Sequence, residues 1–101
     1  MWLIVMFDLP VKTDEEKHAY RRFHGFLLKD GFDRMQYSVY IRCCPSPENA
    51  EVHLKRIGGS VPPEGQVRIM QLTDKQFERM KVYQGKIRKK PEKPPTQLTL
   101  F

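Results

Sequence analysis

The hydrophobic and polar positions of the chain change period several times, and each change predicts a new structural element. Residues 2–7 are consecutively apolar and include β-branched and aromatic side chains, which is typical of a strand buried on both faces. Thr13 and Glu16 have the spacing of a helix capping box, and apolar residues then recur every three or four positions. We therefore expect a helix that begins after Thr13 and ends at Gly31, a residue suited to a left-handed cap.

Residues 32–44 alternate between apolar and polar positions, which predicts β structure. Because this stretch is longer than an ordinary strand, two interpretations remain open. It forms either two short strands with a break between Gln36 and Ser38 or one long bent strand. Ser46 and Pro47 then predict the start of a second helix, since serine caps a helix well and proline suits its first turn.

The rest of the chain repeats these signals. Gly58 and Gly59 are expected to end the second helix, and residues 67–72 alternate as a strand. Thr73 has a capping partner three residues later, which predicts a short third helix. Residues 80–84 suit one more short strand.

The order of these elements predicts an α+β fold of the ferredoxin-like βαββαβ type, with an extra C-terminal strand. Both long helices would cover one face of the sheet, yet the first strand is apolar on both of its faces. The second face therefore also needs cover, so we expect a homodimer that pairs sheet to sheet. The expected organisation is a ferredoxin-like domain over 1–84, a basic proline-rich linker over 85–95 and a strand-like tail over 96–101.

The composition of the chain limits its size to one domain and gives it a basic net charge. The chain has 101 residues, which is enough for one core but not for two domains. Its 18 Lys and Arg against 12 Asp and Glu give a net charge of +6, and residues 75–93 alone account for this surplus. A basic balance favours a polyanionic partner.

The apolar runs and the two cysteines indicate the cellular compartment in which we expect the protein. The longest apolar run, residues 2–7, is far shorter than the roughly 20 residues that span a bilayer, so we expect no membrane association. Cys43 and Cys44 are adjacent, and a bridge between neighbours would strain the peptide. We therefore expect two reduced thiols and a cytoplasmic protein.

Asp8 directly follows the apolar run and is the only carboxylate among the first thirteen residues. One interpretation is a turn residue, because Asp-Leu-Pro is a natural exit from a strand. The other is a ligand for Mg²⁺, which proteins usually hold through one or two carboxylates and several waters. One aspartate is too few, but two copies facing each other across a dimer would form a metal site that activates water for phosphodiester cleavage.

Basic side chains without a matching set of exposed aromatics favour phosphate contacts that do not depend on base sequence. One cluster follows Asp8, where a merely solvated helix face is the alternative, and a second lies in the linker. The candidate nucleic-acid-binding residues are Lys12, Lys17, Arg21, Arg22, Arg88, Lys89 and Lys90.

Seven segments of the chain have a combination and spacing typical of one known family. They are residues 1–10 (MWLIVMFDLP), 20–27 (YRRFHGFL), 31–32 (GF), 36–40 (QYSVY), 65–68 (GQVR), 73–77 (TDKQF) and 98–101 (LTLF). Together they resemble the small CRISPR adaptation nuclease family, and look most like its type II branch. The resemblance covers nearly the whole chain.

This resemblance implies a ferredoxin-like partner of the CRISPR integrase with metal-dependent endoribonuclease activity. Asp8 matches the family's catalytic and metal-binding aspartate, and the family's symmetric dimer places two of them at a Mg²⁺ or Mn²⁺ ion. The resemblance also implies that two integrase dimers flank this dimer, which holds the middle of a DNA duplex on its basic face. Leu98, Leu100 and Phe101 would belong to a tail that joins a neighbouring sheet and binds the partner.

Two functions follow, and they can coexist. The first is a Mg²⁺-dependent endonuclease that cuts RNA or double-stranded DNA during spacer acquisition in antiviral defence, with an activity that is weak or dispensable. The second is a non-catalytic scaffold of the integration complex, which binds duplex DNA and bridges integrase dimers. A stand-alone ferredoxin-like regulator is a third interpretation.

Overall fold

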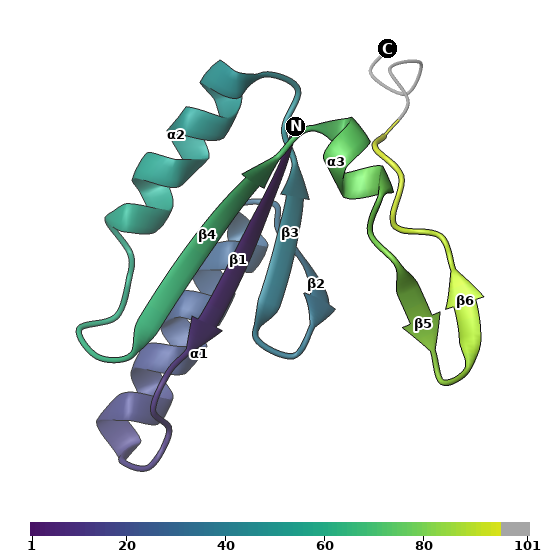
Figure 1. Cartoon of the computed structure of the whole chain (residues 1–101). Coiled ribbons are helices and arrows are strands. Elements are labelled where there is room, and N and C mark those ends of the chain that lie inside the picture. The colour runs from purple at the N-terminus through teal and green to yellow at the C-terminus, as the bar shows by residue number, and fades with distance from the viewer. Residues whose placement is uncertain (96–101) are drawn as a thin grey trace.

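The centre of the protein is a four-stranded antiparallel sheet in the order β2-β3-β1-β4 (Figure 1). The structure, a computed structural model, describes residues 1–95. Its elements are β1 (Trp2–Asp8), α1 (Asp14–Lys29), β2 (Asp33–Gln36), β3 (Val39–Cys43), α2 (Pro47–Gly58), β4 (Gln66–Leu72), α3 (Asp74–Glu78), β5 (Val82–Gln84) and β6 (Ile87–Lys89). The predicted α+β fold with ferredoxin-like element order is confirmed.

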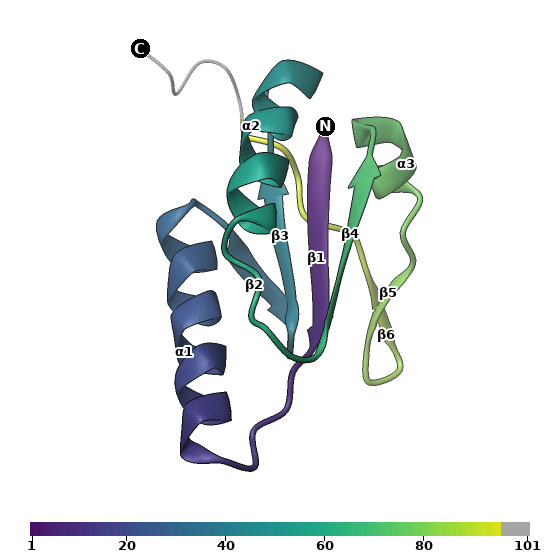
Figure 2. The same ribbon diagram turned by 90° about the vertical axis from the view of Figure 1, so that its left-hand side faces the viewer.

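The two long helices α1 and α2 lie side by side on one face of the sheet (Figures 1 and 2). On that face Leu3, Val5 and Phe7 of β1 are buried in the main core. On the opposite face Trp2 and Ile4 are buried in a second apolar cluster. The unbroken apolar run of β1 is therefore buried on both faces, as predicted.

We call the side of the sheet opposite α1 and α2 the open face. The prediction that a single chain leaves this face uncovered is wrong in part, because α3 covers one end of it. There Trp2 stacks on Phe77 of α3, with ring centroids 4.2 Å apart. Further along this face, Met70, which lies opposite Ile4, is 44% exposed, and Met6, towards Asp8, is half-buried. The apolar surface left over therefore lies between the middle of the sheet and its Asp8 end.

The three predicted helix starts are confirmed by side-chain caps. The Thr13 hydroxyl accepts a hydrogen bond from the Glu16 amide at 3.1 Å, and the Glu16 carboxylate accepts one from the Thr13 amide at 2.9 Å. Thr73 begins α3 with the same kind of capping box, and the Ser46 side chain caps α2. Within residues 1–95, no helix combines the length and apolar character that crossing a membrane requires.

The stretch 32–44 forms two strands, so the first of the two interpretations is confirmed. β2 and β3 are joined at Tyr37 and Ser38, and Ser38 has a φ of 62°. Serine enters this left-handed region only occasionally. The turn is therefore made without the glycine or proline that would have marked it in the sequence.

β5 and β6 form a hairpin that turns at Gly85, whose φ is 62°. β5 agrees with the strand expected within 80–84. β6 lies inside the segment 85–95, so the expectation of a plain linker there is wrong for residues 87–89, which pair with β5. Three residues are too few for their alternation to be recognised. The tail predicted over 96–101 lies outside the described residues.

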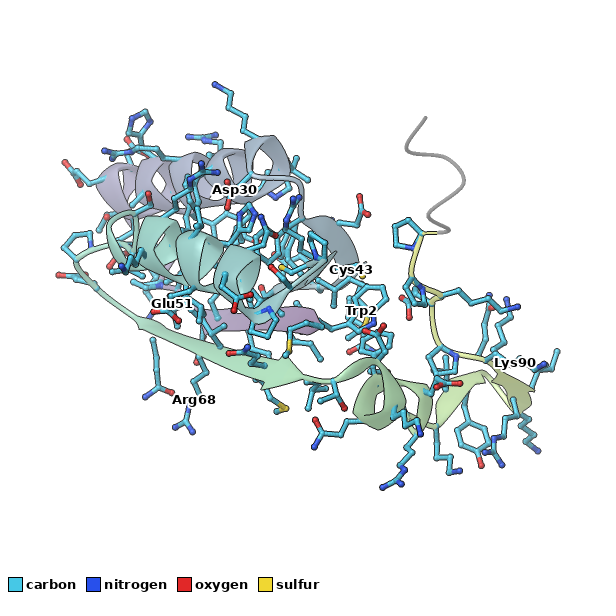
Figure 3. All side chains as sticks on the ribbon, turned by 90° about the horizontal axis from the view of Figure 1, so that it is seen from above. Trp2, Asp30, Cys43, Glu51, Arg68 and Lys90 are labelled. Atoms are coloured by element: carbon cyan, nitrogen blue, oxygen red, sulfur yellow. The ribbon has the colours of Figure 1, made fainter. Side chains whose placement is uncertain are left out.

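An ion-pair network at the end of α1 had no counterpart in the sequence analysis. The Asp30 carboxylate accepts hydrogen bonds from Nδ1 of the buried His53 at 2.7 Å and from Nη1 of Arg56 at 2.9 Å. Nη1 of Arg42 donates to the Asp30 carbonyl at 3.1 Å. Because these partners lie on α2 and β3, the network joins both long helices and the sheet around Asp30 (Figure 3).

Gly31 ends α1 as predicted, in a left-handed conformation with a φ of 87°. Its amide donates to the Leu28 carbonyl at 3.1 Å, and the Phe32 amide donates to the Leu27 carbonyl at 2.9 Å. This pair of bonds is the Schellman motif. A Cβ at Gly31 would also overlap the Arg42 guanidinium. The backbone therefore favours glycine here, and an added Cβ would also displace the Arg42 guanidinium, which is hydrogen-bonded to the Asp30 carbonyl.

Replacing Gly31 by alanine should destabilise the protein. The left-handed backbone alone costs a residue with a Cβ about 1–2 kcal/mol, which lowers the Tm of a domain of this size by roughly 4–16 °C. Gly25→Ala is the matched control, because Gly25 lies inside α1 and an added Cβ there meets no atom within 4 Å. That change should stabilise the helix by up to about 1 kcal/mol. Thermal unfolding distinguishes the two, and equal effects would contradict this explanation of Gly31.

Candidate functional site

Asp8 is the last residue of β1 and is exposed. Alternation along the strand places its side chain on the open face, together with Trp2, Ile4 and Met6. In the antiparallel register Asp8 lies opposite Gln66 of β4. The candidate metal ligand therefore stands where the apolar part of the open face ends.

Arg68 of β4 lies beside Asp8 on the open face. Met6 is paired with Arg68 and Asp8 with Gln66, so both β4 side chains share the face of Asp8. Nε of Arg68 donates to the Gln66 side-chain oxygen at 3.2 Å, and Arg68 points away from the sheet on the side opposite α1 and α2 (Figure 3). Within residues 1–95 Asp8 makes no ion pair, so both charges are available to a ligand.

Sequence reasoning missed Gln66 and Arg68. The alternation of 67–72 did place Arg68 on one face of a strand, but not the register between that strand and β1. The only available signal was the segment 65–68, which entered as part of the resemblance and not as a site.

Two backbone contacts fix the position of Asp8. The Phe7 amide donates to the Ser38 carbonyl at 3.1 Å, which brings the β2–β3 turn to the end of β1. On the other side Gly65, with a φ of 88°, lies so close that an added Cβ would be 2.7 Å from the Asp8 carbonyl oxygen. Three segments therefore meet at Asp8, and the approach of the last one requires a glycine.

A single chain contributes one carboxylate to this site. Among the described residues no group of three or more His, Cys, Asp or Glu side chains is arranged to hold a metal ion. Carboxylate oxygens are suitable ligands for Mg²⁺, but a site of this kind usually needs one or two of them together with waters or substrate phosphates. The donor chemistry of Asp8 fits Mg²⁺, and a second copy would supply a second carboxylate.

The predicted nucleic-acid-binding residues form two separate groups. Lys12 precedes α1, and Lys17, Arg21 and Arg22 lie on its surface, while the others belong to β6 or directly follow it: Arg88, Lys89 and Lys90. All seven are exposed. The α1 helix and the hairpin lie on opposite sides of the sheet (Figure 2), so one chain does not bring the two groups together.

The predicted partner-binding residues Leu98, Leu100 and Phe101 lie outside the described residues. The cysteines are unpaired, as expected, and burial raises the pKa of the Cys43 and Cys44 thiols. Such thiols are weak nucleophiles at neutral pH. They do not form a competing reactive site.

The Tyr40 hydroxyl, which sequence reasoning did not single out, is hydrogen-bonded to Nδ1 of His24 on the helix-covered side. Burial raises the pKa of Tyr40. Tyr40 packs against Phe7 in the main core, with stacked rings 5.6 Å apart. The pair is therefore a structural contact between α1 and β3, away from Asp8 on the open face.

Comparison with known proteins identifies the family. The family model described as "CRISPR associated protein Cas2" matches residues 1–80. A protein of Parvibaculum lavamentivorans named CRISPR-associated endoribonuclease Cas2 is 56% identical over 101 residues, which is all of both chains. A protein of the same name from Flavobacterium psychrophilum is 48% identical over all of this chain and 88% of its own length. The crystal structure of Streptococcus pyogenes Cas2 at pH 6.5 superposes with a TM-score of 0.61 at 20% identity, over 83% of this chain and 100% of that one. The chain belongs to the family of the CRISPR-associated protein Cas2.

Proposed function

We propose that this protein is a metal-dependent endonuclease that works as a homodimer in CRISPR spacer acquisition. Asp8 from each subunit would hold Mg²⁺, or Mn²⁺ as the alternative ion, between the two chains. The observation that supports this best is an exposed carboxylate without an ion-pair partner among residues 1–95, at the uncovered end of an apolar sheet face and beside Arg68. The names of the relatives, CRISPR-associated endoribonuclease, agree with this chemistry.

The open face supplies the reason to dimerise. Between the middle of this face and its Asp8 end, the apolar side chains Met6, Met35, Val39 and Met70 are only half-buried or exposed. A second copy placed against this part of the face would bury these side chains. Each Å² of apolar surface removed from water contributes about 25 cal/mol of favourable free energy. The same contact would bring two Asp8 carboxylates together, so the packing that completes the face also completes the metal site.

Each residue at the site would then have one task. A bound Mg²⁺ supplies Lewis-acid chemistry that activates water and shields the phosphate. Asp8 holds the ion, and Arg68 donates hydrogen bonds to the phosphate oxygens on which negative charge develops. Gln66 holds the Arg68 guanidinium through the bond to its Nε. The substrate would be a phosphodiester of RNA or of duplex DNA.

The second candidate function is a non-catalytic scaffold that holds duplex DNA and bridges two integrase dimers. It is favoured by the seven exposed basic side chains, which lie on or next to α1 and the hairpin. A dimer would present two such surfaces from each chain, which suits a long duplex. The tail over 96–101 would attach the integrase.

Asp8→Asn should abolish cleavage of labelled RNA and duplex DNA in the presence of Mg²⁺. The substitution keeps the shape of the side chain but removes the charge that holds the ion. Because metal catalysis provides several kcal/mol of transition-state stabilisation, we expect the rate to fall by about 100-fold or more. Asp33→Asn, an exposed carboxylate on β2, is the control and should leave the rate unchanged.

Unchanged cleavage by Asp8→Asn, or equal cleavage with Mg²⁺ and with excess chelator, would contradict the catalytic proposal. If the wild type cuts neither substrate and Asp8→Asn still supports spacer integration in cells, the scaffold is the function.

Substitution of Arg68 should change kcat, whereas substitution of the basic hairpin residues should change the affinity for duplex. Arg68→Ala should lower kcat by about 10- to 100-fold with little change in duplex affinity, because its interaction strengthens as charge develops on the phosphate. The triple variant Arg88→Ala/Lys89→Ala/Lys90→Ala should instead weaken binding and reduce the slope of log affinity against log salt by about 0.9 for each phosphate that these side chains no longer neutralise. Single-turnover kinetics and binding at several salt concentrations measure both. A salt-insensitive affinity, or an Arg68 effect confined to binding, would contradict these assignments.

A further inference from the structure

The aromatic ring of Tyr37 stands in the turn between β2 and β3, close to the end of β1 that carries Asp8. Tyr37 is 73% exposed, which is the largest exposed fraction among the large hydrophobic side chains of residues 1–95. An exposed ring alone carries no function, because single hydrophobic side chains are common on protein surfaces. Three features of its surroundings, however, suit this ring to hold a nucleobase.

The first feature is a cation on one side of the ring. Cζ of Arg34 lies over the Tyr37 ring, 4.9 Å from its centroid, and the Arg34 side chain is itself exposed. This cation–π contact orients the ring and leaves its other face in water. Aromatic rings with free faces and basic neighbours are what proteins use to bind unpaired nucleotides, since the bases stack on the rings and the cations attract the phosphates.

The second feature is that the turn carrying Tyr37 is held in place. The next residue, Ser38, has a φ of 62°, a conformation that a serine keeps only where its surroundings fix it. The Phe7 amide donates to the Ser38 carbonyl at 3.1 Å and provides one such contact. A hydrogen bond with Tyr20 of α1 raises the pKa of Tyr37, so the phenol is uncharged at neutral pH and does not repel phosphate.

The third feature is the position of the ring relative to Asp8. The β2–β3 turn and the end of β1 lie at the same end of the sheet (Figure 1). Because its partner Tyr20 belongs to α1, Tyr37 lies on the helix side of that end, and a dimer joined through the open faces leaves it accessible. A strand that touches both Asp8 and Tyr37 must bend around the end of the sheet, which a single strand does far more easily than a stiff duplex.

We propose that Tyr37 is a stacking platform for one unpaired nucleobase of the substrate, next to the phosphate held at Asp8. This inference rests on the proposed endonuclease function. Arg34 and the exposed Lys17, which lies one turn before Tyr20 on α1, would contact the phosphates around that base. Every base has a face that stacks, so the platform would select unpaired over paired nucleotides and not a base sequence.

Two ligands distinguish stacking from phosphate binding: a short single-stranded RNA and an oligomer of the same length in which abasic sugars replace the nucleosides. Both are bound in excess chelator, so that neither is cut. Tyr37→Ala should raise the dissociation constant of the RNA by about 5- to 150-fold, the range that one stacked base provides, and should leave that of the abasic oligomer unchanged. Tyr37→Phe keeps the ring, so it is the matched control and should bind the RNA like the wild type. Duplex RNA of the same sequence should bind wild type and Tyr37→Ala equally.

Equal weakening of RNA and abasic oligomer by Tyr37→Ala would overturn the platform, because the loss would then come from phosphate contacts or from folding. Unchanged affinity for both ligands would also overturn it, and Asp8-dependent cleavage by the same protein would leave the proposed function standing. Conversely, base-dependent binding by a protein that cuts neither RNA nor duplex DNA would support the platform and overturn the endonuclease.

Discussion

The structure depends on how the two faces of β1 are covered. α1 and α2 bury one face completely, whereas α3 reaches only the Trp2 end of the other. Asp8 stands at the end that stays open, next to the half-buried Met6 on the same face. In the proposed dimer, the hydrophobic gain of covering this end and the assembly of a two-carboxylate site are one event.

Charge is distributed in a way that suits this arrangement. The basic side chains proposed to bind nucleic acid lie on or next to α1 and the hairpin, while three carboxylates gather around the beginning of α1 and the loop before β4. In the proposed function, nucleic acid would be attracted to these basic surfaces and repelled from the carboxylates. Arg68 stands instead on the open face, close to Asp8.

Local signals in the sequence were sufficient for most of the fold. The capping residues Thr13, Ser46 and Thr73 and the left-handed Gly31 act within a few residues, so each could be identified without knowing the topology. Contacts between distant segments could not be identified in this way. The pairing of Asp8 with Gln66, the cover provided by α3 and the Asp30 network all depend on register and packing, which composition and period do not determine.

The candidate site likewise contains residues that a local sequence signal identifies and residues that only the tertiary structure brings in. Asp8 could be found because a single carboxylate after an apolar strand is conspicuous, but its neighbour Arg68 comes from a strand almost sixty residues later. The turn at Ser38 and the strand β6 were missed or left open for a related reason: a serine with positive φ and a three-residue strand leave almost no pattern.

The most direct test of the central claim is the distance between the two copies of residue 66 in solution. A spin label on Gln66→Cys, in a Cys43→Ser/Cys44→Ala background, allows it to be measured by double electron–electron resonance. Because residue 66 lies opposite Asp8 in the sheet, we expect a dimer with a single short distance between the labels. A monomer, or a dimer whose labels lie at opposite ends, would contradict the claim.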